Sequence, residues 1–186
     1  MYSPSDFRKG LRIVVDDQPY YVVDYQHFKM GRGKANIRTK LKHLKTGAVV
    51  EKVFGSNDSF QPPDVEEKKM QYLYENVGEL TFMDSTTFEQ ITVPTENLGD
   101  ARWYLLENDE YKVMFLDGEP LSVDLPASVV LEVVETEPAA KGDTVTNVTK
   151  PAKLQTGLQV KVPPFVKEGD KVKVDTRSGD YLERAN

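Results

Sequence analysis

The feature that most constrains this chain is the recurrence of short segments rich in Val, Ile, Tyr, Phe and Thr, separated by Gly, Asn, Asp or Pro. Residues of the first group favour strands, and those of the second favour turns. Helical periodicity is scarce, so the pattern predicts small all-β domains. The predicted strands cover residues 11–15, 20–28, 35–44, 48–54, 69–75, 79–84, 88–93, 111–116, 119–125, 129–135, 153–156, 159–163, 171–175 and 180–184.

These predicted strands fall into three groups, which we interpret as three β-barrel domains in series. Residues 55–64 have the Pro, Gly, Ser and Asn composition of a connection, and Pro126 marks a hinge before the last group. The predicted domains span residues 1–63, 64–128 and 129–186, and roughly five strands are expected to close the first barrel. Periodicity alone also permits one larger sandwich.

Residues 97–108 are the best candidate for a helix. Apolar residues recur at helical spacing within this segment, and Glu96 or Asn97 is positioned to cap its start. Four or five strands with one helix make up an OB-fold, a partly open barrel often used on nucleic acid. The last third of the chain repeats the strand pattern of the middle third.

Charge is distributed unevenly along the chain, although the net charge is −6. Residues 1–63 carry a net charge of +5, residues 64–128 carry −11, and residues 129–186 are neutral. An acidic body with one basic end is repelled by a phosphate-rich partner in every orientation but one. The pattern therefore predicts a docking direction.

The composition of the chain argues against disulfides, metal sites and catalysis. The chain has no cysteine, which excludes disulfides and cysteine-ligated zinc and suits a reducing cytoplasm. His27 and His43 are the only histidines, so we expect no metal site, no catalytic residues and no cofactor. No apolar run approaches the roughly 20 residues that span a bilayer, and we predict a cytoplasmic protein without membrane contact.

The most informative segment is a basic hairpin between Asp24 and Glu51. It holds seven Lys and Arg residues and no acidic residue, so the remainder of the chain carries a net charge of −13. Strand alternation places Ala35, Ile37, Thr39 and Leu41 on one face, and Asn36, Arg38, Lys40 and Lys42 on the other. The residues that we predict to contact RNA are Lys29, Lys34, Arg38, Lys40 and Lys42.

At the turn of this hairpin, Arg32 lies between Gly31 and Gly33. Glycines permit positive φ and leave the arginine with almost no bulk beside it, so its guanidinium can project toward phosphates or bases. Glycines also serve any hairpin turn, and a basic face is often merely solvated, so both interpretations stay open. A phosphate-binding P-loop is a poor alternative, because no glycine lies five residues before Gly33 and Ala35 stands where Ser or Thr is required.

The last third of the chain carries two long motifs. Residues 150–169 read Lys-Pro-Ala-Lys-Leu-Gln-Thr-Gly-Leu-Gln-Val-Lys-Val-Pro-Pro-Phe-Val-Lys-Glu-Gly, and residues 174–181 read Val-Asp-Thr-Arg-Ser-Gly-Asp-Tyr. With these motifs the chain resembles the bacterial elongation factor P family over essentially its full length. The resemblance implies an SH3-like barrel followed by two OB-folds, arranged in a tRNA-like L shape.

The same resemblance implies a translation elongation factor that is not an enzyme. Such a factor binds the ribosome between the peptidyl and exit sites and relieves stalling at consecutive prolines by positioning the peptidyl-tRNA. By resemblance, Arg32 lies toward the peptidyl-transferase centre, and Gly142, Asp143 and Thr144 lie near the exit-site codon. The implied partners are ribosomal RNA, ribosomal proteins and peptidyl-tRNA, and we expect the factor itself to be a monomer.

The hairpin tip departs from the commonest pattern of the family. Many members have a modified lysine in a Pro-Gly-Lys-Gly setting, whereas Arg32 takes that position here. A subset of the family has arginine there, glycosylated with rhamnose in some members. Arg32 is therefore a candidate modification site with a modifying enzyme as a further partner. Lys34, the other candidate, falls after the second glycine.

Three alternatives compete with this interpretation. A paralogue in the elongation factor P-like group is the nearest. A generic single-stranded RNA-binding OB protein needs aromatic platforms beside basic residues, whereas four aromatic residues lie in the acidic middle third and are predicted to serve the core or protein contacts. These are Tyr72, Tyr74, Phe82 and Phe88. A small hydrolase is opposed by the residue inventory, since Asp16–Asp17 and Asp109–Glu110 read as solvated turns.

Overall fold

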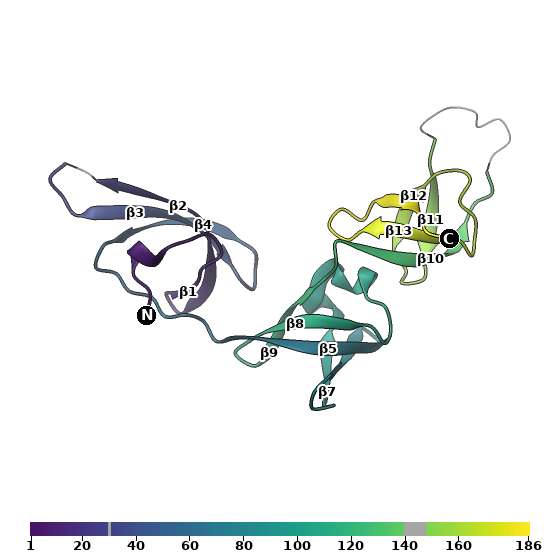
Figure 1. Ribbon diagram of the computed structural model, residues 1–186, viewed down its shortest axis with the longest axis horizontal. Helices are drawn as coiled ribbons and strands as arrows, with labels where there is room; N and C mark the ends of the chain where they lie inside the picture. The colour runs from purple at the N-terminus through teal and green to yellow at the C-terminus, as the bar shows by residue number, and fades with distance from the viewer. Residues whose placement is uncertain (30, 140–147) are drawn as a thin grey trace. The chain divides into compact units, whose positions relative to one another are not determined.

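The computed structural model describes residues 1–29, 31–139 and 148–186 (Figure 1). Strands are its main element, and they form three sheets. The chain divides into two compact units, namely residues 1–66 with 116–119 and residues 67–115 with 120–186. The predicted all-β class is confirmed. The three predicted domain ranges stay a proposal.

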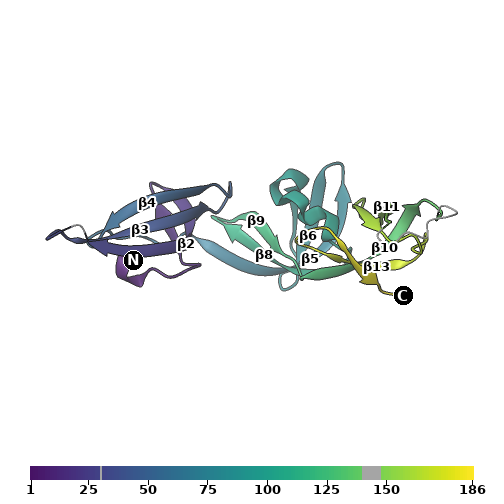
Figure 2. The same cartoon turned by 90° about the horizontal axis from the view of Figure 1, so that it is seen from above.

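The first sheet lies in the first unit and has the strand order β1-β2-β3-β4 (Figure 2). Its elements are the 3-10 helix η1 (Pro4–Asp6) and strands β1 (Arg12–Val15), β2 (Gln18–Lys29), β3 (Ala35–His43) and β4 (Val49–Gly55). The expected fifth strand is not found among the described residues, because the segment after β4 contributes only an isolated bridge between Tyr2 and Phe60.

The core of the first unit has an aromatic cluster at its centre. Phe7 and Phe54 pack edge to face with ring centroids 6.0 Å apart, and Phe60 lies 4.7 Å from Phe54. Buried aromatic pairs of this kind let a small unit hold its own core.

Asp16 and Asp17 form the turn from β1 to β2 with φ of 50° and 60°, which confirms the predicted turn at these residues.

The second unit contains two five-stranded sheets. Their strand orders are β7-β6-β5-β8-β9 and β12-β11-β10-β13-β14. The elements of the middle sheet are β5 (Val65–Asn76), β6 (Glu79–Asp84), β7 (Gln90–Pro94), the 3-10 helix η2 (Thr95–Tyr104), β8 (Glu110–Leu116) and β9 (Glu119–Asp124). Those of the last sheet are β10 (Ser128–Thr136), β11 (Lys150–Leu154), β12 (Gln159–Val162), β13 (Lys171–Asp175) and β14 (Tyr181–Arg184).

The predicted helix over residues 97–108 is wrong in type and extent. The segment forms η2, which is interrupted at Gly99 with φ 56° and ψ −134°, and Pro94 precedes it without a side-chain cap. Because Gly99 leaves the helical region, the two halves of η2 face different neighbours. Leu98 packs in the core of the middle sheet, and Tyr104 packs in the core of the last sheet.

The middle and last sheets are therefore joined by side chains as well as by the connection at Pro126. Tyr104 is 6% exposed and packs among the core residues of the last sheet. The Thr156 hydroxyl donates a hydrogen bond of 2.7 Å to the Trp103 carbonyl. Gln155 and Thr156 form a turn in which the Gly157 N–H donates a hydrogen bond of 2.8 Å to the Leu154 carbonyl, so β11 ends at Leu154 and not at the predicted residue 156.

One hydroxyl group is buried in the core beneath β3. Thr39 is fully buried, and its Oγ1 has no hydrogen-bond partner among the described residues. A buried hydroxyl without a partner costs about 1–3 kcal/mol. Replacing Thr39 with the isosteric valine is expected to raise the free energy of unfolding by ~1 kcal/mol, measured by urea denaturation. Thr39→Ala, which leaves a small cavity, is the control and should not stabilise. An unchanged midpoint for Thr39→Val would contradict the idea.

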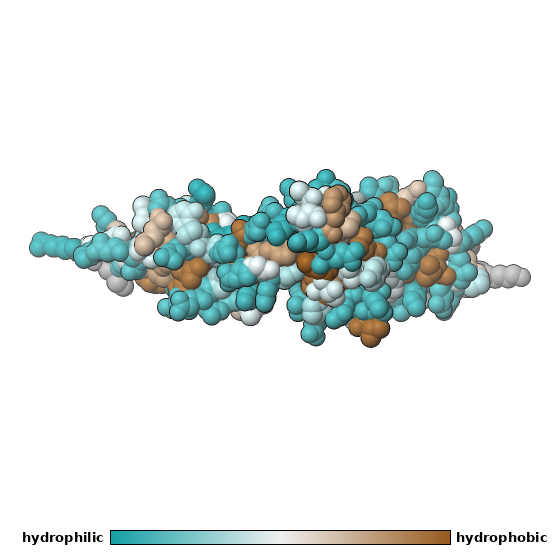
Figure 3. Space-filling view, turned by 90° about the horizontal axis from the view of Figure 1, so that it is seen from below, coloured by the Kyte–Doolittle hydropathy of each residue, from teal (hydrophilic) through white to brown (hydrophobic). Residues whose placement is uncertain are grey.

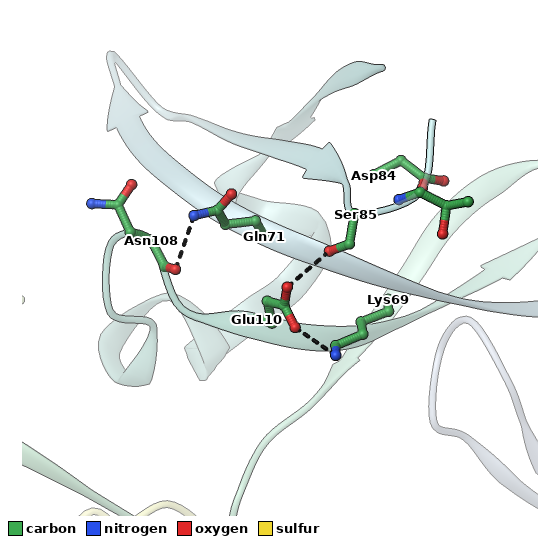
Figure 4. Close-up of polar contacts among 7 residues, drawn as sticks. Lys69, Gln71, Asp84, Ser85, Asn108 and Glu110 are labelled. Atoms are coloured by element: carbon green, nitrogen blue, oxygen red, sulfur yellow. Dashed lines mark hydrogen bonds and ion pairs between the residues drawn. The ribbon is translucent and has the colours of Figure 1, made fainter. Parts of the chain in front are cut away.

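Polar side chains link β5, β8 and the turn after β6 (Figure 4). Lys69 Nζ lies 2.6 Å from Glu110 Oε2, and the Ser85 hydroxyl donates to Glu110 Oε1 at 3.4 Å. The hydrogen bond from Lys69 lowers the pKa of Glu110. Asp109–Glu110 was predicted to be a solvated turn, which is wrong for Glu110, because it begins β8 and pairs with Lys69 across the sheet.

Asp84 closes the turn from β6 to β7 (Figure 4). Its Oδ1 accepts hydrogen bonds from the backbone N–H groups of Thr86 at 2.7 Å and Thr87 at 3.0 Å. The backbone hydrogen bonds from Thr87 and Thr86 hold the pKa of this carboxyl below its usual 3.8. Because the folded pKa is lowered, the stabilisation is present above the unfolded pKa and is lost as pH falls through the folded value.

Replacing Asp84 with asparagine should therefore destabilise the protein only while the carboxyl is ionised. We expect a lower melting temperature than wild type at about pH 7 and no difference at about pH 2, where protonated aspartate resembles asparagine. Thermal unfolding of both proteins across this range measures the effect. A difference that stays constant with pH would mean that the charge of Asp84 contributes nothing.

Candidate functional site

The candidate site is the hairpin formed by β2 and β3 (Figure 1). Its strands pair as far as Lys29 opposite Ala35, with one bulge at Val23. Strand β4 follows β3 as far as Asn36 opposite Gly55. The hairpin is thus a three-stranded arm over most of its length, and only its last pair and its turn extend beyond the sheet.

The tip of the hairpin is open to solvent. Gly31, Arg32, Gly33 and Lys34 are all exposed. Gly31 has φ 57°, and no heavy atom lies within 4 Å of the position that a Cβ would take there. The projecting end of this hairpin is hydrophilic in Figure 3, at the far left. A left-handed glycine beside an uncrowded arginine is the arrangement that the sequence predicted.

The predicted alternation along β3 is confirmed. Ile37, Thr39 and Leu41 are buried, whereas Arg38 and Lys40 are exposed and Lys42 is half-buried. Apolar side chains on the inner face pack against the core of the first unit. The basic side chains therefore share the outer face of the sheet because the strand period is two.

The register brings acidic residues onto this outer face. Lys40 is opposite Asp24 on β2 and opposite Glu51 on β4. In the sequence, Asp24 and Glu51 lie at the two ends of the segment that has no acidic residue. In the folded sheet, both lie opposite Lys40, near the middle of that segment. Lys40 therefore has an acidic cross-strand partner on each side, which sequence reasoning missed because it counted charges along the chain and not across the strands.

Two cations of the outer face lie over aromatic rings, which the sequence did not predict. The Arg38 guanidinium carbon is 5.5 Å from the centroid of the Phe28 ring. Lys42 Nζ is 5.8 Å from the centroid of the Tyr21 ring. Such cation–π contacts hold the stems of long side chains and leave their donors free to bind anions.

The remaining two predicted RNA contacts, Lys29 and Lys34, do not lie on the basic outer face. Lys29 is opposite Ala35, so it belongs to the inner side of the hairpin, at the end where that side is exposed. Lys34 is exposed in the turn beside Arg32. The structure thus places Arg38 and Lys42 over separate aromatic rings on the outer face, gives Lys40 acidic cross-strand partners, and leaves Lys29 and Lys34 near the tip.

Both histidine side chains make contacts with neighbouring residues of the first unit. His43 Nδ1 accepts hydrogen bonds from the backbone N–H groups of Lys45 at 3.0 Å and Thr46 at 3.2 Å, and its Nε2 lies 3.0 Å from Gln18 Oε1. His27 packs edge-on against Tyr25. Among the described residues, no group of three His, Asp or Glu side chains could hold a metal ion.

The second unit contains a polar cleft of about 630 Å³ beside η2. Tyr72 lines it, and burial raises the pKa of this phenol to about 12. Arg102 Nη2 pairs with Glu75 Oε1 at 2.7 Å in the same cleft. Tyr72 and Phe82 are core residues, as predicted, whereas Tyr74 and Phe88 are exposed. Two of the four aromatic residues are thus unavailable as platforms for single-stranded RNA.

The predicted exit-site residues Gly142, Asp143 and Thr144 lie outside the described part of the chain. The strand that follows this segment, β11, begins at Lys150. The ammonium group of this buried lysine donates a hydrogen bond of 2.6 Å to the Glu137 carbonyl. Among the described residues, no helix is both long and apolar enough to cross a membrane.

Comparison with known proteins covers nearly the whole chain. Three family models match it: "Elongation factor P (EF-P) KOW-like domain" at residues 3–60, "Elongation factor P (EF-P) OB domain" at 65–123, and "Elongation factor P, C-terminal" at 129–184. The chain belongs to the elongation factor P family. As a member of this family it is a translation elongation factor and not an enzyme.

Individual relatives agree with this assignment. Elongation factor P from Desulfovibrio desulfuricans is 53% identical to this chain, and that from Nitratidesulfovibrio vulgaris is 51% identical. Each alignment covers 184 residues, which is 99% of this chain and 100% of the relative. The resemblance inferred from the motifs at residues 150–181 is therefore confirmed.

The fold of this elongation factor P is also found in more distant proteins. A eukaryotic translation initiation factor 5A from Methanococcus jannaschii is similar with a TM-score of 0.57 at 19% identity, over 66% of this chain and 90% of that chain. An initiation factor 5A family protein from Naegleria fowleri gives a TM-score of 0.52 at 18% identity, over 67% of this chain and 94% of that chain. At this identity the likeness concerns the fold alone.

Proposed function

We propose that this elongation factor P binds the ribosome between the peptidyl and exit sites and stimulates peptide-bond formation at consecutive prolines. The observation that carries the proposal is the hairpin, a stiff arm whose exposed tip holds Arg32 next to a left-handed Gly31. Its outer face displays Arg38 and Lys42, which suit RNA phosphates. In this proposal the tip points toward the peptidyl-transferase centre.

The proposed mechanism is positional. Proline reacts slowly because its ring fixes φ and constrains the approach of its secondary amine. Prolines in the growing chain restrict the carbonyl partner as well. An arm that holds the end of the peptidyl-tRNA in attack geometry lowers the entropic part of the barrier. Such an arm needs no acid, base or nucleophile of its own, which is consistent with a translation factor.

Other parts of the proposal concern partners. Ribosomal RNA and proteins would bind the factor in the cytoplasm, and Gly142, Asp143 and Thr144 would lie near the exit-site codon. Arg32 is the proposed modification site, because its exposed position leaves it open to a modifying enzyme. Lys29 and Lys34 near the tip would add positive charge close to the tRNA end.

Reconstituted translation tests this function. A message with consecutive prolines is translated with and without the factor, beside a proline-free message of the same length. We expect the factor to speed the first message and to leave the second unchanged. Equal stimulation of both messages, or of neither by protein purified from its native host, would contradict the proposal.

We expect the factor to be a monomer in solution, since docking on a ribosome as proposed leaves little surface for self-association. Light scattering coupled to size exclusion measures this, with a mass near the 21.1 kDa of one chain as the expected result. A stable dimer at micromolar concentration would count against the proposed mode of binding.

A further inference from the structure

The polar cleft beside η2 carries more negative charge than its own residues neutralise. Carboxylates of Glu75, Glu107 and Asp109 line it, against the single guanidinium of Arg102, so its net charge is −2. This guanidinium is already engaged, because its Nη2 pairs with Glu75, its carbon lies 4.3 Å from the centroid of the Trp103 ring, and its Nε is enclosed by the protein. Within the described part of the chain, the carboxylates of Glu107 and Asp109 have neither an ion pair nor a hydrogen bond. The cleft therefore suits a cation.

The two carboxylates without partners belong to a loop that is fixed to β5. The Tyr72 N–H donates a hydrogen bond of 2.9 Å to the Asp109 carbonyl, and the Asn108 N–H donates one of 2.6 Å to the Tyr72 carbonyl. Gln71 Nε2 also donates to the Asn108 carbonyl at 3.0 Å (Figure 4). Glu107 and Asp109 lie on either side of this anchored residue. A ligand that binds them does not have to order the loop, which lowers the entropic cost of binding.

One side chain that lines the cleft is almost fully buried and has a hydroxyl without a partner. Tyr72 is 5% exposed, and its ring packs 5.4 Å from the Phe82 ring in the core of the middle sheet. The hydroxyl is therefore the part that faces the cleft, and no described residue forms a hydrogen bond with it. Burial raises the pKa of this phenol, and the charges of Glu75 and Glu107 add to the shift, so its oxygen lies near both carboxylates. A neutral phenol oxygen in this position can accept a hydrogen bond from a cation.

The way these groups are distributed indicates which kind of cation fits. In the described ranges of the chain, no three acidic or histidine side chains converge on a point that could hold a metal ion. The carboxylates are spread along a cleft of about 630 Å³, a size within the range of sites for organic ligands. Leu105 and Leu106 line the same cleft and offer apolar contact. A chain of methylene groups that carries several ammonium groups matches both features, because its stem can lie on apolar surface while its charges meet carboxylates.

We propose that this cleft binds a linear aliphatic polyamine, with Glu107 and Asp109 pairing its ammonium groups and the Tyr72 hydroxyl accepting a hydrogen bond from one of them. Lysine side chains of a peptide offer the same alkylammonium chemistry, and the two sources can be distinguished by experiment. This inference goes beyond the proposed function and does not rest on it. It gives the second unit a small-molecule site that is separate from the basic hairpin of the first unit.

Fluorescence of Trp103 measures this binding, because it is the only tryptophan of the chain and Arg102, which lines the cleft, lies over its ring. The full-length protein is titrated with spermidine at constant ionic strength, and we expect a saturable change in emission. Replacing Glu107 with glutamine together with Asp109 with asparagine should weaken binding by about tenfold, since each lost pair of exposed charges contributes modestly.

The matched control is Glu89→Gln with Asp124→Asn, which removes the same two charges from exposed positions outside the cleft. This control should change the affinity for spermidine by less than about twofold, because salt screens distant exposed charges. Tyr72→Phe removes only the hydroxyl and should weaken binding by about fivefold. Tyr74→Phe, at an exposed position two residues along β5, should leave the affinity unchanged.

Three outcomes would overturn the polyamine site. An emission change that does not saturate would do so, as would equal weakening in the control pair or an equal response to magnesium at the same ionic strength. Tighter binding of the peptide acetyl-Lys-Gly-Lys-amide, lost in the Glu107 and Asp109 pair, would refute a free polyamine and assign the cleft to lysines of a protein. If circular dichroism shows that this pair is misfolded, Tyr72→Phe still decides. The proline translation assay is independent, so neither result bears on the proposed function.

Discussion

Replacing Arg32 with alanine is expected to lower the stimulation of translation through consecutive prolines by roughly 10- to 100-fold, because misplacement of a reacting group by about an ångström has an effect of this size. Arg32 is exposed at the tip, next to a glycine whose neighbourhood is empty, so its loss should not disturb the core. Ribosome affinity should fall much less than the rate, because the basic outer face is unchanged.

The measurement is the rate of formation of a proline-proline bond on reconstituted ribosomes at saturating factor. Lys45→Ala is the control, since it removes an exposed cation of the same unit that is not among the predicted RNA contacts. Arg32→Lys separates charge from guanidinium geometry. Full activity of Arg32→Ala would move the active contact elsewhere on the factor. Mass analysis of the native peptide containing Arg32 shows whether a modification must be restored before the wild type is judged.

Replacing Tyr104 with alanine is expected to have the largest effect on stability, a loss of roughly 3–5 kcal/mol. Tyr104 belongs to η2 beside the middle sheet, yet it is buried among the core residues of the last sheet, including Leu131 and Val174. Its removal should leave a cavity in that core and separate the unfolding of the two sheets. Trp103 and Leu125, which pack against the same core, would lose a neighbour.

Guanidinium denaturation followed by Trp103 fluorescence and by circular dichroism measures both effects. In the wild type we expect the middle and last sheets to unfold together, so that the two probes agree for this unit. Tyr104→Phe keeps the ring and is the matched control, with a loss below about 1.5 kcal/mol expected. If Tyr104→Ala cost as little as Tyr104→Phe, the shared core would not hold the two sheets together.

Much of the strand pattern could be predicted because it depends on local alternation. Two predicted strands, at residues 79–84 and 171–175, agree with the observed β6 and β13 at both ends. Alternating Ile37, Thr39 and Leu41 also predicted correctly which face of β3 is buried. A strand with one buried face carries this information in its own residues, since the side-chain period is two.

The predictions that failed depended on contacts between distant residues. Residues 97–108 have helical spacing, but Gly99 breaks the helix and Tyr104 serves the core of another sheet. Glu110 was predicted to be in a solvated turn, but Lys69 from β5 pairs with it. Gly99 is a local break, but the burial of Leu98 and Tyr104 in two different cores and the pairing of β8 within the middle sheet are tertiary, and such packing overrides local propensity.

For the candidate site, the sequence by itself determined the basic strand, the arginine between two glycines and the family motifs, because each is a property of consecutive residues. Only the tertiary structure decided which charges meet. Register placed Asp24 and Glu51 beside Lys40, and folding placed Arg38 over the Phe28 ring and Lys42 over the Tyr21 ring. Strand pairing depends on turn geometry and on the bulge at Val23, and neither can be read from a count of charges along the chain.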